Sequence, residues 1–355
     1  MAMLKGLLVS LAILLPSVHA NPVKYVVRNQ TCTLETAAVR KEWGSLTTSE
    51  RSNYIDAVLC VQNLPSQLNL AGTKSRYDDF AATHINLTRS VHNNGVFFHW
   101  HRHFAYLWES LLRDECGYQG YQPYWNWALW PDLAASPIFD GSMTSLGGNG
   151  EPIVDRPQTT TGPNGQILPV GTGGGCIHSG PFANMTVTMG PFPSTEMREG
   201  LRSNWSDYSP RCLSRDLNQF GYQFTNQTMI DLALKQPNIG AFTEFVDVGV
   251  TGAQFGPHTG GHYSVGGVMR DVFASPFEPA FFLHHTMVDK LWHDWQIIDF
   301  PERQFQYNGT STVFNGNSTP PVSNETEIFF LSVGKTMRVK DVVNTLGGPY
   351  CYRYE

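Results

Sequence analysis

The chain has 355 residues, of which 41% are hydrophobic and 15% charged, and its formal net charge is −6. This composition is typical of a globular protein with enough apolar material for a sizeable core. A mildly acidic chain with few charges is a poor candidate for binding nucleic acid or an anionic membrane, so we expect neither as a partner.

Residues 1–20 have the pattern of a secretory signal peptide. Lys5 supplies the basic region, a short apolar run extends from Gly6 to Leu15, and Ala20 is a small residue suited to cleavage. The run is shorter than the roughly 20 apolar residues of a membrane span, and an uncleaved anchor is the alternative. We expect residues 21–355 to form one catalytic domain, because the sequence has neither repeats nor a clear linker.

Cysteines and glycosylation sequons also favour secretion. The six cysteines include no CxxC pair, and an even number in an exported protein indicates disulfides rather than a cysteine zinc site. Eight asparagines begin an Asn-x-Ser/Thr sequon: Asn29, Asn86, Asn184, Asn204, Asn226, Asn308, Asn317 and Asn324. We therefore expect a eukaryotic, extracellular glycoprotein.

Helical sequence dominates the first third of the chain. Residues 33–61 contain good helix formers, with a second helix beginning near a cap at Thr47 or Thr48. Residues 78–87 are predicted to be helical. Residues 96–116 form a long aromatic run without glycine or proline, bounded by a glycine on each side, and this pattern predicts a long helix.

The rest of the chain is more varied. Residues 131–193 are dense in Gly, Pro, Ser and Thr, which predicts a long loop region with short strands. A disulfide between Cys176 and Cys212 is expected to pin it. Helical stretches follow within residues 213–234, and a strongly helical run begins after Pro279. Residues 301–355 are strand-like and polar.

Histidines gather in two stretches at spacings typical of metal ligands. The first includes His84, His92, His99, His101 and His103, and the second includes His258, His262, His284 and His285. Imidazole binds copper, zinc, iron and nickel readily at neutral pH. The clusters therefore predict two metal ions, or one site assembled from both halves of the chain.

Helix geometry limits which histidines can share a metal. At about 100° per residue, His99 and His103 lie about 200° around a helix from His101, so only one face of this trio can point inward. His258 and His262 are one turn apart on one face. His284 and His285 point about 100° apart, which predicts one ligand between them.

Four histidines are interpreted as ordinary core or surface residues: His99, His103, His178 and His293. The pair His258 and His262 alone could belong to a zinc hydrolase. The glutamate of an HExxH motif is missing, however, and two glycines lie between the two histidines.

The chain resembles the tyrosinases, catechol oxidases and molluscan haemocyanins, which share a type-3 copper centre. Their first motif is matched by His84, His92 and His101, the last within Phe97-Phe98-His99-Trp100-His101-Arg102 and followed by Tyr106 and Glu109. Their second is matched by Pro257-His258 and His262, then by Glu278-Pro279-Ala280-Phe281-Phe282-Leu283-His284-His285 and Asp289. Tyr352-Arg353-Tyr354 resembles their closing Tyr-x-Tyr signature. The eight residues from His84 to His92 are similar to the spacing in short secreted tyrosinases of filamentous fungi.

This resemblance implies two copper ions per chain, with O2 as co-substrate. Copper A would be held by His84, His92 and His101, and copper B by His258, His262 and His285, with His284 as a neighbour. The implied fold is mainly α: a tyrosinase-like four-helix bundle that holds the dicopper centre, with long loops and a few short β-strands. Asp289, one turn after His285, is expected to orient a ligand.

The chain departs from the family pattern beside these ligands. Ser90 stands two residues before His92, and no cysteine lies nearby to form the thioether found in many members. Gln254 and Thr259 stand where good phenol hydroxylases often have Glu and Asn. A Gln–Thr pair is less able to deprotonate a phenol, which favours catechol oxidation.

Two further positions are expected to shape substrate access. Val272 stands where plant catechol oxidases have a bulky Phe, so the copper A side is expected to be open. Tyr263 is expected to line the entrance and orient a polar substrate with its hydroxyl; ordinary packing is the alternative for both residues.

The leading hypothesis is a secreted dicopper oxidase that converts o-diphenols to o-quinones and reduces O2 to water, with small phenols as its partners. The alternatives are a monophenol-hydroxylating tyrosinase and a pathway-specific phenol oxidase of pigment or secondary metabolism. A haemocyanin-like oxygen carrier is less favoured, since the chain ends at Glu355 without a further domain to block the site. The oligomeric state stays open.

Overall fold

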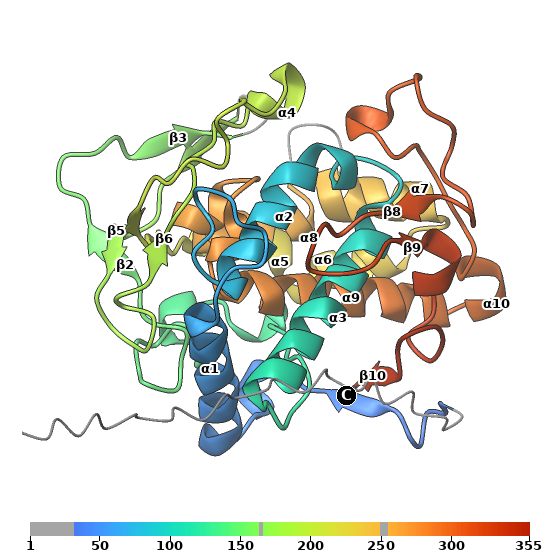
Figure 1. Cartoon of the computed structure of the whole chain (residues 1–355), viewed down its shortest axis with the longest axis horizontal. Coiled ribbons are helices and arrows are strands. Elements are labelled where there is room, and N and C mark those ends of the chain that lie inside the picture. Colours follow the sequence, from blue (N-terminus) through green and yellow to red (C-terminus); the bar gives the residue numbers. More distant parts are fainter. Residues whose placement is uncertain (1–31, 163–165, 249–254) are drawn as a thin grey trace, which may run out of the picture. The chain divides into compact units, whose positions relative to one another are not determined.

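Four helices at the centre of the computed structural model carry the clustered histidines (Figure 1): α2 (Arg76–Val91), α3 (Phe97–Cys116), α8 (Pro257–Val265) and α9 (Ala280–Ile297). The structure describes residues 32–162, 166–248 and 255–355, so the expected signal peptide, Asn29 and Gln254 lie outside the described residues. α3 packs against α2 and α9, and α8 packs against α9. The expected mainly α fold with a helical bundle is confirmed.

Local sequence explains where the central helices begin and end. At the start of α2, Ser75 and Asp78 form a reciprocal capping box. α3 ends at Gly117, whose φ of 67° lies in the left-handed region that favours glycine. Between α3 and α9, the Trp108 and Phe282 rings stack with centroids 3.9 Å apart. Stacked aromatic pairs of this kind fix the spacing of the two helices.

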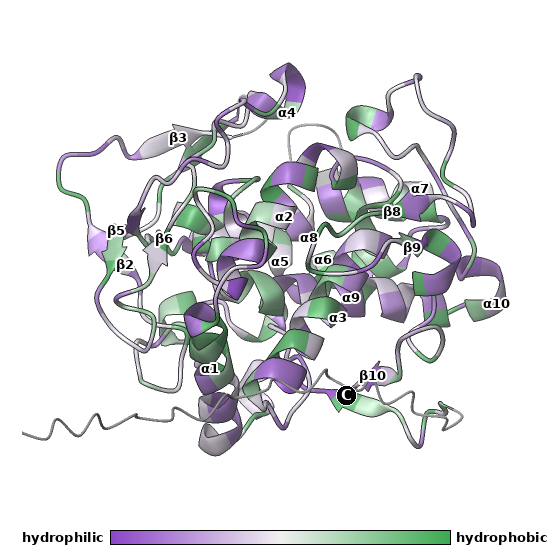
Figure 2. Ribbon diagram, viewed as in Figure 1, coloured by the Kyte–Doolittle hydropathy of each residue, from purple (hydrophilic) through white to green (hydrophobic). Residues whose placement is uncertain are grey.

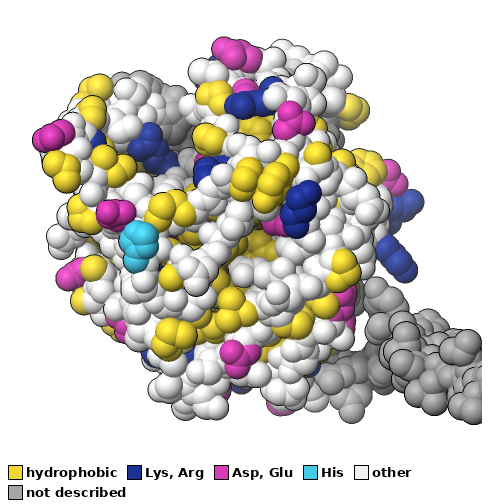
Figure 3. Space-filling model, turned by 60° about the vertical axis from the view of Figure 1, so that its left-hand side comes forward, with side chains coloured by type: hydrophobic (Ala, Val, Ile, Leu, Met, Phe, Trp, Pro, Cys, Tyr) yellow, Lys and Arg dark blue, Asp and Glu magenta, His cyan; other side chains and the backbone are white. Residues whose placement is uncertain are grey.

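The core around these helices is rich in aromatic side chains. Seven tryptophans are among its largest fully buried side chains: Trp43, Trp100, Trp108, Trp125, Trp127, Trp292 and Trp295. Figure 2 shows hydrophobic residues spread through α1 and α3, alternating with hydrophilic ones. On the face in Figure 3, the described basic and acidic side chains are interspersed. No helix among the described residues is long and apolar enough to cross a membrane.

The prediction of a helix at the start of residues 33–61 is wrong. Strand β1 (Ala38–Arg40) instead pairs in parallel with β10 (Tyr352–Tyr354), and α1 (Thr48–Asn63) begins only after a capping box at Thr47. Tertiary contacts override the local helix propensity, because the buried Arg40 guanidinium bonds Glu109 and the Tyr354 hydroxyl.

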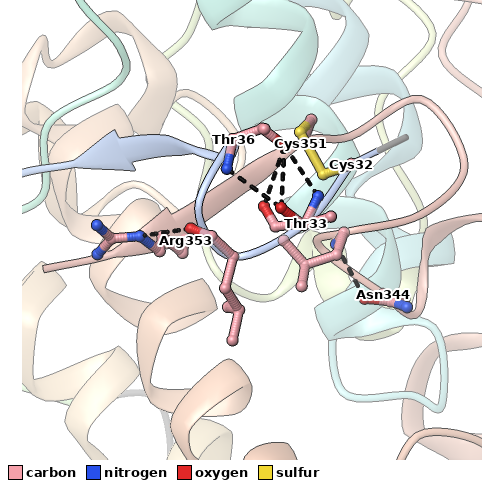
Figure 4. The surroundings of a disulfide bond; sticks show 8 residues. Cys32, Thr33, Thr36, Asn344, Cys351 and Arg353 are labelled. Atoms are coloured by element: carbon pink, nitrogen blue, oxygen red, sulfur yellow. Dashed lines mark hydrogen bonds between the residues drawn. A yellow bond between two sulfur atoms is a disulfide. The ribbon is translucent and has the colours of Figure 1, made fainter. Parts of the chain in front are cut away.

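A disulfide between Cys32 and Cys351 joins the two chain segments beside this strand pair (Figure 4). The Thr33 amide donates to the Thr36 hydroxyl next to it, and Arg353 donates to the backbone carbonyl of Leu34. A second disulfide, Cys60–Cys116, joins α1 to the end of α3.

The glycine-rich region forms loops with short antiparallel strand pairs, as predicted. The strands are β2 (Gly150–Pro152) with β5 (Gly174–Ile177), β3 (Thr159–Thr161) with β4 (Ile167–Pro169), and β6 (Thr186–Val187) with β7 (Arg211–Cys212). The expected Cys176–Cys212 disulfide is confirmed and links β5 to β7.

Short helices fill the remaining connections. They are α4 (Glu196–Glu199), α5 (Tyr222–Thr225), α6 (Gln227–Leu234), α7 (Ile239–Thr243) and α10 (Phe300–Arg303). A π-helical turn, Glu244–Val248, follows α7. In the C-terminal region, the strand-like prediction holds for β8 (Glu327–Ile328), β9 (Met337–Arg338) and β10, while the segments between them are mostly irregular.

Candidate metal centre

The first histidine group comes from α2 and α3. His84 lies within α2, His92 caps its C-terminus and His101 lies in α3; one ring nitrogen of each lies within 4.8 Å of the others. The three Nδ1 atoms face the backbone oxygens of Phe273, Thr88 and Phe97 at 2.8, 3.0 and 2.8 Å, respectively. A carbonyl can only accept, so Nδ1 carries the proton and Nε2 presents a lone pair. Nε2 of His84 and of His101 is buried and has no hydrogen-bond partner within residues 32–162, 166–248 and 255–355.

The second group comes from α8 and α9 and holds four histidines: His258, His262, His284 and His285. Nε2 of His262 lies 3.1 Å from Nε2 of His258 and 3.2 Å from Nε2 of His285. Nδ1 of His262 faces the Met269 carbonyl at 2.8 Å, and Nδ1 of His258 faces a carboxylate oxygen of Asp247 at 2.8 Å.

These contacts test whether the second group suits a metal ion. Because Nδ1 of His258 and of His262 donates to an oxygen, the Nε2 atoms 3.1 Å apart carry lone pairs that face each other. Two facing lone pairs repel unless a cation lies between them. Neutral imidazole is a good ligand for copper, so the donor set fits that metal.

His284 differs from its neighbours in the second group. Its Nδ1 accepts a hydrogen bond from the Trp127 indole at 3.0 Å. Its ring packs so closely on α8 that a Cβ at Gly261 would lie 2.2 Å from Cε1 of His284. Glycine at this position therefore permits the approach of α9 to α8, and Trp127 fixes the orientation of the His284 ring.

The two groups face each other across the bundle. The His101 and His285 rings stack with centroids 4.4 Å apart and planes 15° apart. The His92 and His258 rings lie 6.2 Å apart. Of the six histidines matched to the family's copper ligands, only His262 is half-buried, and the other five are buried. His262 is therefore the most exposed of the six.

Burial keeps five of these six imidazoles neutral. It is the largest cause that lowers the pKa of His84, His101, His262 and His285 well below 6.5. Burial, together with the nearby His258, also lowers the pKa of His92 to about 4, although Asp247 and the Thr88 backbone oppose the shift. A neutral ring keeps the lone pair that a metal needs.

The histidines interpreted as ordinary residues lie outside both groups. His99 packs edge-on against the Trp292 ring, and Nδ1 of His103 lies 2.8 Å from the Tyr350 hydroxyl. His178 is exposed beside Glu151, and the His293 ring packs against Tyr354. Helix geometry separated His99 and His103 from His101 correctly.

The structure corrects the role expected for Asp289. Its carboxylate accepts bonds from Arg102 at 2.5 Å, Tyr352 at 2.6 Å and Tyr354 at 2.5 Å. Nδ1 of His285 has no hydrogen-bond partner among the described residues. Asp289 therefore ties α9 to α3 and to the closing Tyr-x-Tyr segment, because these strong donors occupy its oxygens; it does not orient His285.

The expectation for the Tyr263 hydroxyl is also corrected. This hydroxyl donates to the Pro169 carbonyl and accepts from the Asn218 amide at 3.1 Å, and the side chain is only 4% exposed. It packs with Leu168 and Phe255 in a small cluster apart from the main core. Tyr263 therefore packs α8 against strand β4 and has no hydroxyl hydrogen left to offer a substrate.

Three further residues singled out in the sequence lie close in the chain to the candidate ligands. Thr259 is half-buried, and its hydroxyl donates to the Asp247 backbone carbonyl at 2.7 Å. Val272 is half-buried and precedes Phe273, whose carbonyl holds His84. Ser90 is exposed, and every cysteine belongs to one of the three disulfides, so none is free for a thioether to His92.

Sequence reasoning missed Asp247 and Trp127. Asp247 lies 11 residues before His258 in a separate turn, and Trp127 lies 157 residues before His284. Neither spacing belongs to one helix, so no periodicity marks them. The backbone carbonyls that hold the other rings leave no sequence signal of any kind.

Comparisons with known proteins agree with this geometry. The family model of the common central domain of tyrosinase matches residues 74–298, which include all six candidate ligands. Tyrosinase P of Aspergillus terreus is 44% identical over 326 residues, covering 89% of this chain and 91% of that protein. The N-acetyl-6-hydroxytryptophan oxidase of Emericella nidulans is 40% identical over 345 residues, covering 92% and 94%.

A solved structure is also similar along most of its length. A mutant polyphenol oxidase from Thermothelomyces thermophila superposes with a TM-score of 0.84 at 36% identity, covering 92% of this chain and 90% of that one. The chain therefore belongs to the tyrosinase family of type-3 copper oxidases.

Proposed function

We propose that this protein is a secreted dicopper oxidase that converts o-diphenols to o-quinones and reduces O2 to water. His84, His92 and His101 would hold copper A, and His258, His262 and His285 would hold copper B. The observation that carries the proposal is the convergence of these imidazoles, with Nε2 atoms as close as 3.1 Å. Membership of the tyrosinase family supports copper over zinc, which sets the zinc hydrolase aside.

The chain's own side chains would control access and orientation. A bound copper pair would supply electron transfer from catechol to dioxygen, with two catechols oxidised for each O2 reduced to water. A substrate would approach beside His262, the least buried of the six. Val272 leaves room on the copper A side. A threonine hydroxyl is too weak a base to take a proton from an incoming phenol, and the Thr259 hydrogen is already donated to a backbone carbonyl.

This proton argument favours catechol oxidation over monophenol hydroxylation, as the Gln254 position also does. Two alternatives keep some support. A monophenol-hydroxylating tyrosinase is supported by the 44% identity to tyrosinase P, and a narrow pathway oxidase by the 40% identity to the N-acetyl-6-hydroxytryptophan oxidase.

Secretion and glycosylation belong to the same proposal. All six cysteines pair as disulfides, which persist in oxidising compartments. The sequon asparagines Asn86, Asn184, Asn204 and Asn324 are exposed and accessible to glycans.

The test combines copper content with substrate comparison. We expect two copper ions per chain, rapid oxygen uptake with 4-tert-butylcatechol and much slower uptake with the monophenol tyrosol. Comparable rates on the two substrates would contradict the preference for catechols. Oxygen binding without turnover of the catechol would contradict the oxidase itself and favour a carrier.

A further inference from the structure

Asp247 is the one carboxylate, within the described parts of the chain, that contacts either histidine group. Its Oδ1 lies 2.8 Å from Nδ1 of His258. Four other candidate ligands direct Nδ1 at backbone carbonyls, which carry no net charge: His84, His92, His101 and His262. The two proposed copper sites therefore differ in one respect, since only copper B has a ligand with a charged anchor.

The fold builds this carboxylate into the site. Asp247 is 5% exposed and belongs to the π-helical turn Glu244–Val248. Its backbone carbonyl accepts the Thr259 hydroxyl, so the turn binds two consecutive residues of α8. Gly256, just before α8, allows the close approach: a Cβ there would lie 2.2 Å from the carbonyl oxygen of Phe245.

The charge of Asp247 has little compensation from the protein. Its Oδ2 is buried without a hydrogen-bond partner, and His258 is its sole ion-pair partner among the described residues. A buried carboxylate without a full cationic partner is costly. A metal ion on the far side of the His258 ring would offset that cost.

We propose that Asp247 positions His258 and that its negative charge makes copper B the more tightly held ion of the pair. This inference rests on the proposed copper centre. The carboxylate fixes the tautomer that leaves Nε2 free and increases electron donation from the ring to the metal. Loss of such a partner typically weakens metal binding about 10–100-fold.

The experiment compares three variants with the wild type in the full, copper-loaded protein. Asp247→Asn keeps an oxygen acceptor for His258 but removes the charge, and Asp247→Glu keeps the charge. Glu244→Gln removes an exposed charge from the same turn and is the matched control. Each protein is dialysed against increasing concentrations of a copper chelator, and copper per chain and the electron paramagnetic resonance of isolated Cu(II) are measured.

We expect Asp247→Asn to lose one ion at about 10–100-fold lower chelator concentration than the wild type. The remaining ion should then give the resonance of an isolated Cu(II), which a coupled pair does not give. Glu244→Gln should behave as the wild type, and Asp247→Glu should retain both ions better than Asn does.

Two results would overturn the inference: an Asn variant that keeps both ions as the wild type does, or one that loses both ions together. Thermal unfolding of the copper-free proteins checks that the variants fold. If the Asp247→Asn variant folds poorly, the test becomes the comparison of Asp247→Glu with Glu244→Gln. Loss of copper in Glu244→Gln but not in Asp247→Glu would then contradict the inference. If the wild type itself never takes up two copper ions, the proposed function fails instead.

Discussion

The two histidine groups reach a similar arrangement by different means. In the first group, every ring is held by a backbone carbonyl, and for His92 and His101 that carbonyl lies four residues earlier in the chain. In the second group, a carboxylate holds His258, an indole holds His284, and Nδ1 of His285 has no partner in the described part of the chain. Secondary structure therefore orients most of the first group, while distant side chains orient much of the second.

This difference has consequences for substitution. A backbone carbonyl survives replacement of its own side chain, so the first group is insulated against mutations around it. The second group can be altered one anchor at a time. The sharpest tests of the comparison therefore lie in α9, where two adjacent histidines enter the same group.

The largest effect on copper content and activity is expected when His285 and His284 are replaced one at a time. His285→Gln should leave one copper per chain and reduce catechol oxidation to background, because it removes a proposed ligand. His284→Gln should retain two copper ions, since a glutamine oxygen can accept the Trp127 indole hydrogen in its place. Copper analysis and oxygen uptake measure both variants. The reverse pattern would show that the family match selects the wrong member of the pair.

A smaller effect is expected on the stability of the copper-free protein at acid pH, and it comes from a histidine outside the proposed ligand set. Burial, and then the nearby Arg102, lowers the pKa of His99 from 6.5 to about 3. In the unfolded chain the ring takes up a proton near its ordinary pKa, whereas in the folded protein it resists protonation. Stability from this group is complete above about pH 6.5 and is lost as the pH falls toward about 3.

His99→Phe tests this expectation in the copper-free protein. The variant should lose less stability than the wild type between about pH 6.5 and pH 4, by about 3 kcal/mol for a single group. Urea unfolding at several pH values measures the difference. Equal losses in the two proteins would show that His99 does not resist protonation.

Sequence reasoning reached the long helices for a physical reason, whereas the bundle and the two ligand triads came from the resemblance to the family. Helical periodicity is local, so His99 and His103 could be separated from His101 without a structure, and caps such as Thr47 are local as well. It failed where partners are distant in the chain. Arg40 lies in a helix-forming sequence but pairs with the C-terminal strand, and Asp289 lies one turn from His285 but bonds Arg102 instead.

The smallest effect is expected on the free energy of unfolding when the Trp127 indole, which bonds His284, is replaced. Trp127→Phe should lower the free energy of unfolding of the copper-free protein by about 1–3 kcal/mol through the lost hydrogen bond, beyond the effect of the smaller ring. Trp125→Phe is the matched control, because this neighbouring indole is also fully buried but its N–H has no partner among the residues that the structure describes. Urea unfolding of both variants isolates the bond. If the two variants lose equal stability, the indole bond contributes nothing, and the side-chain anchors of the second group matter less than its helix packing.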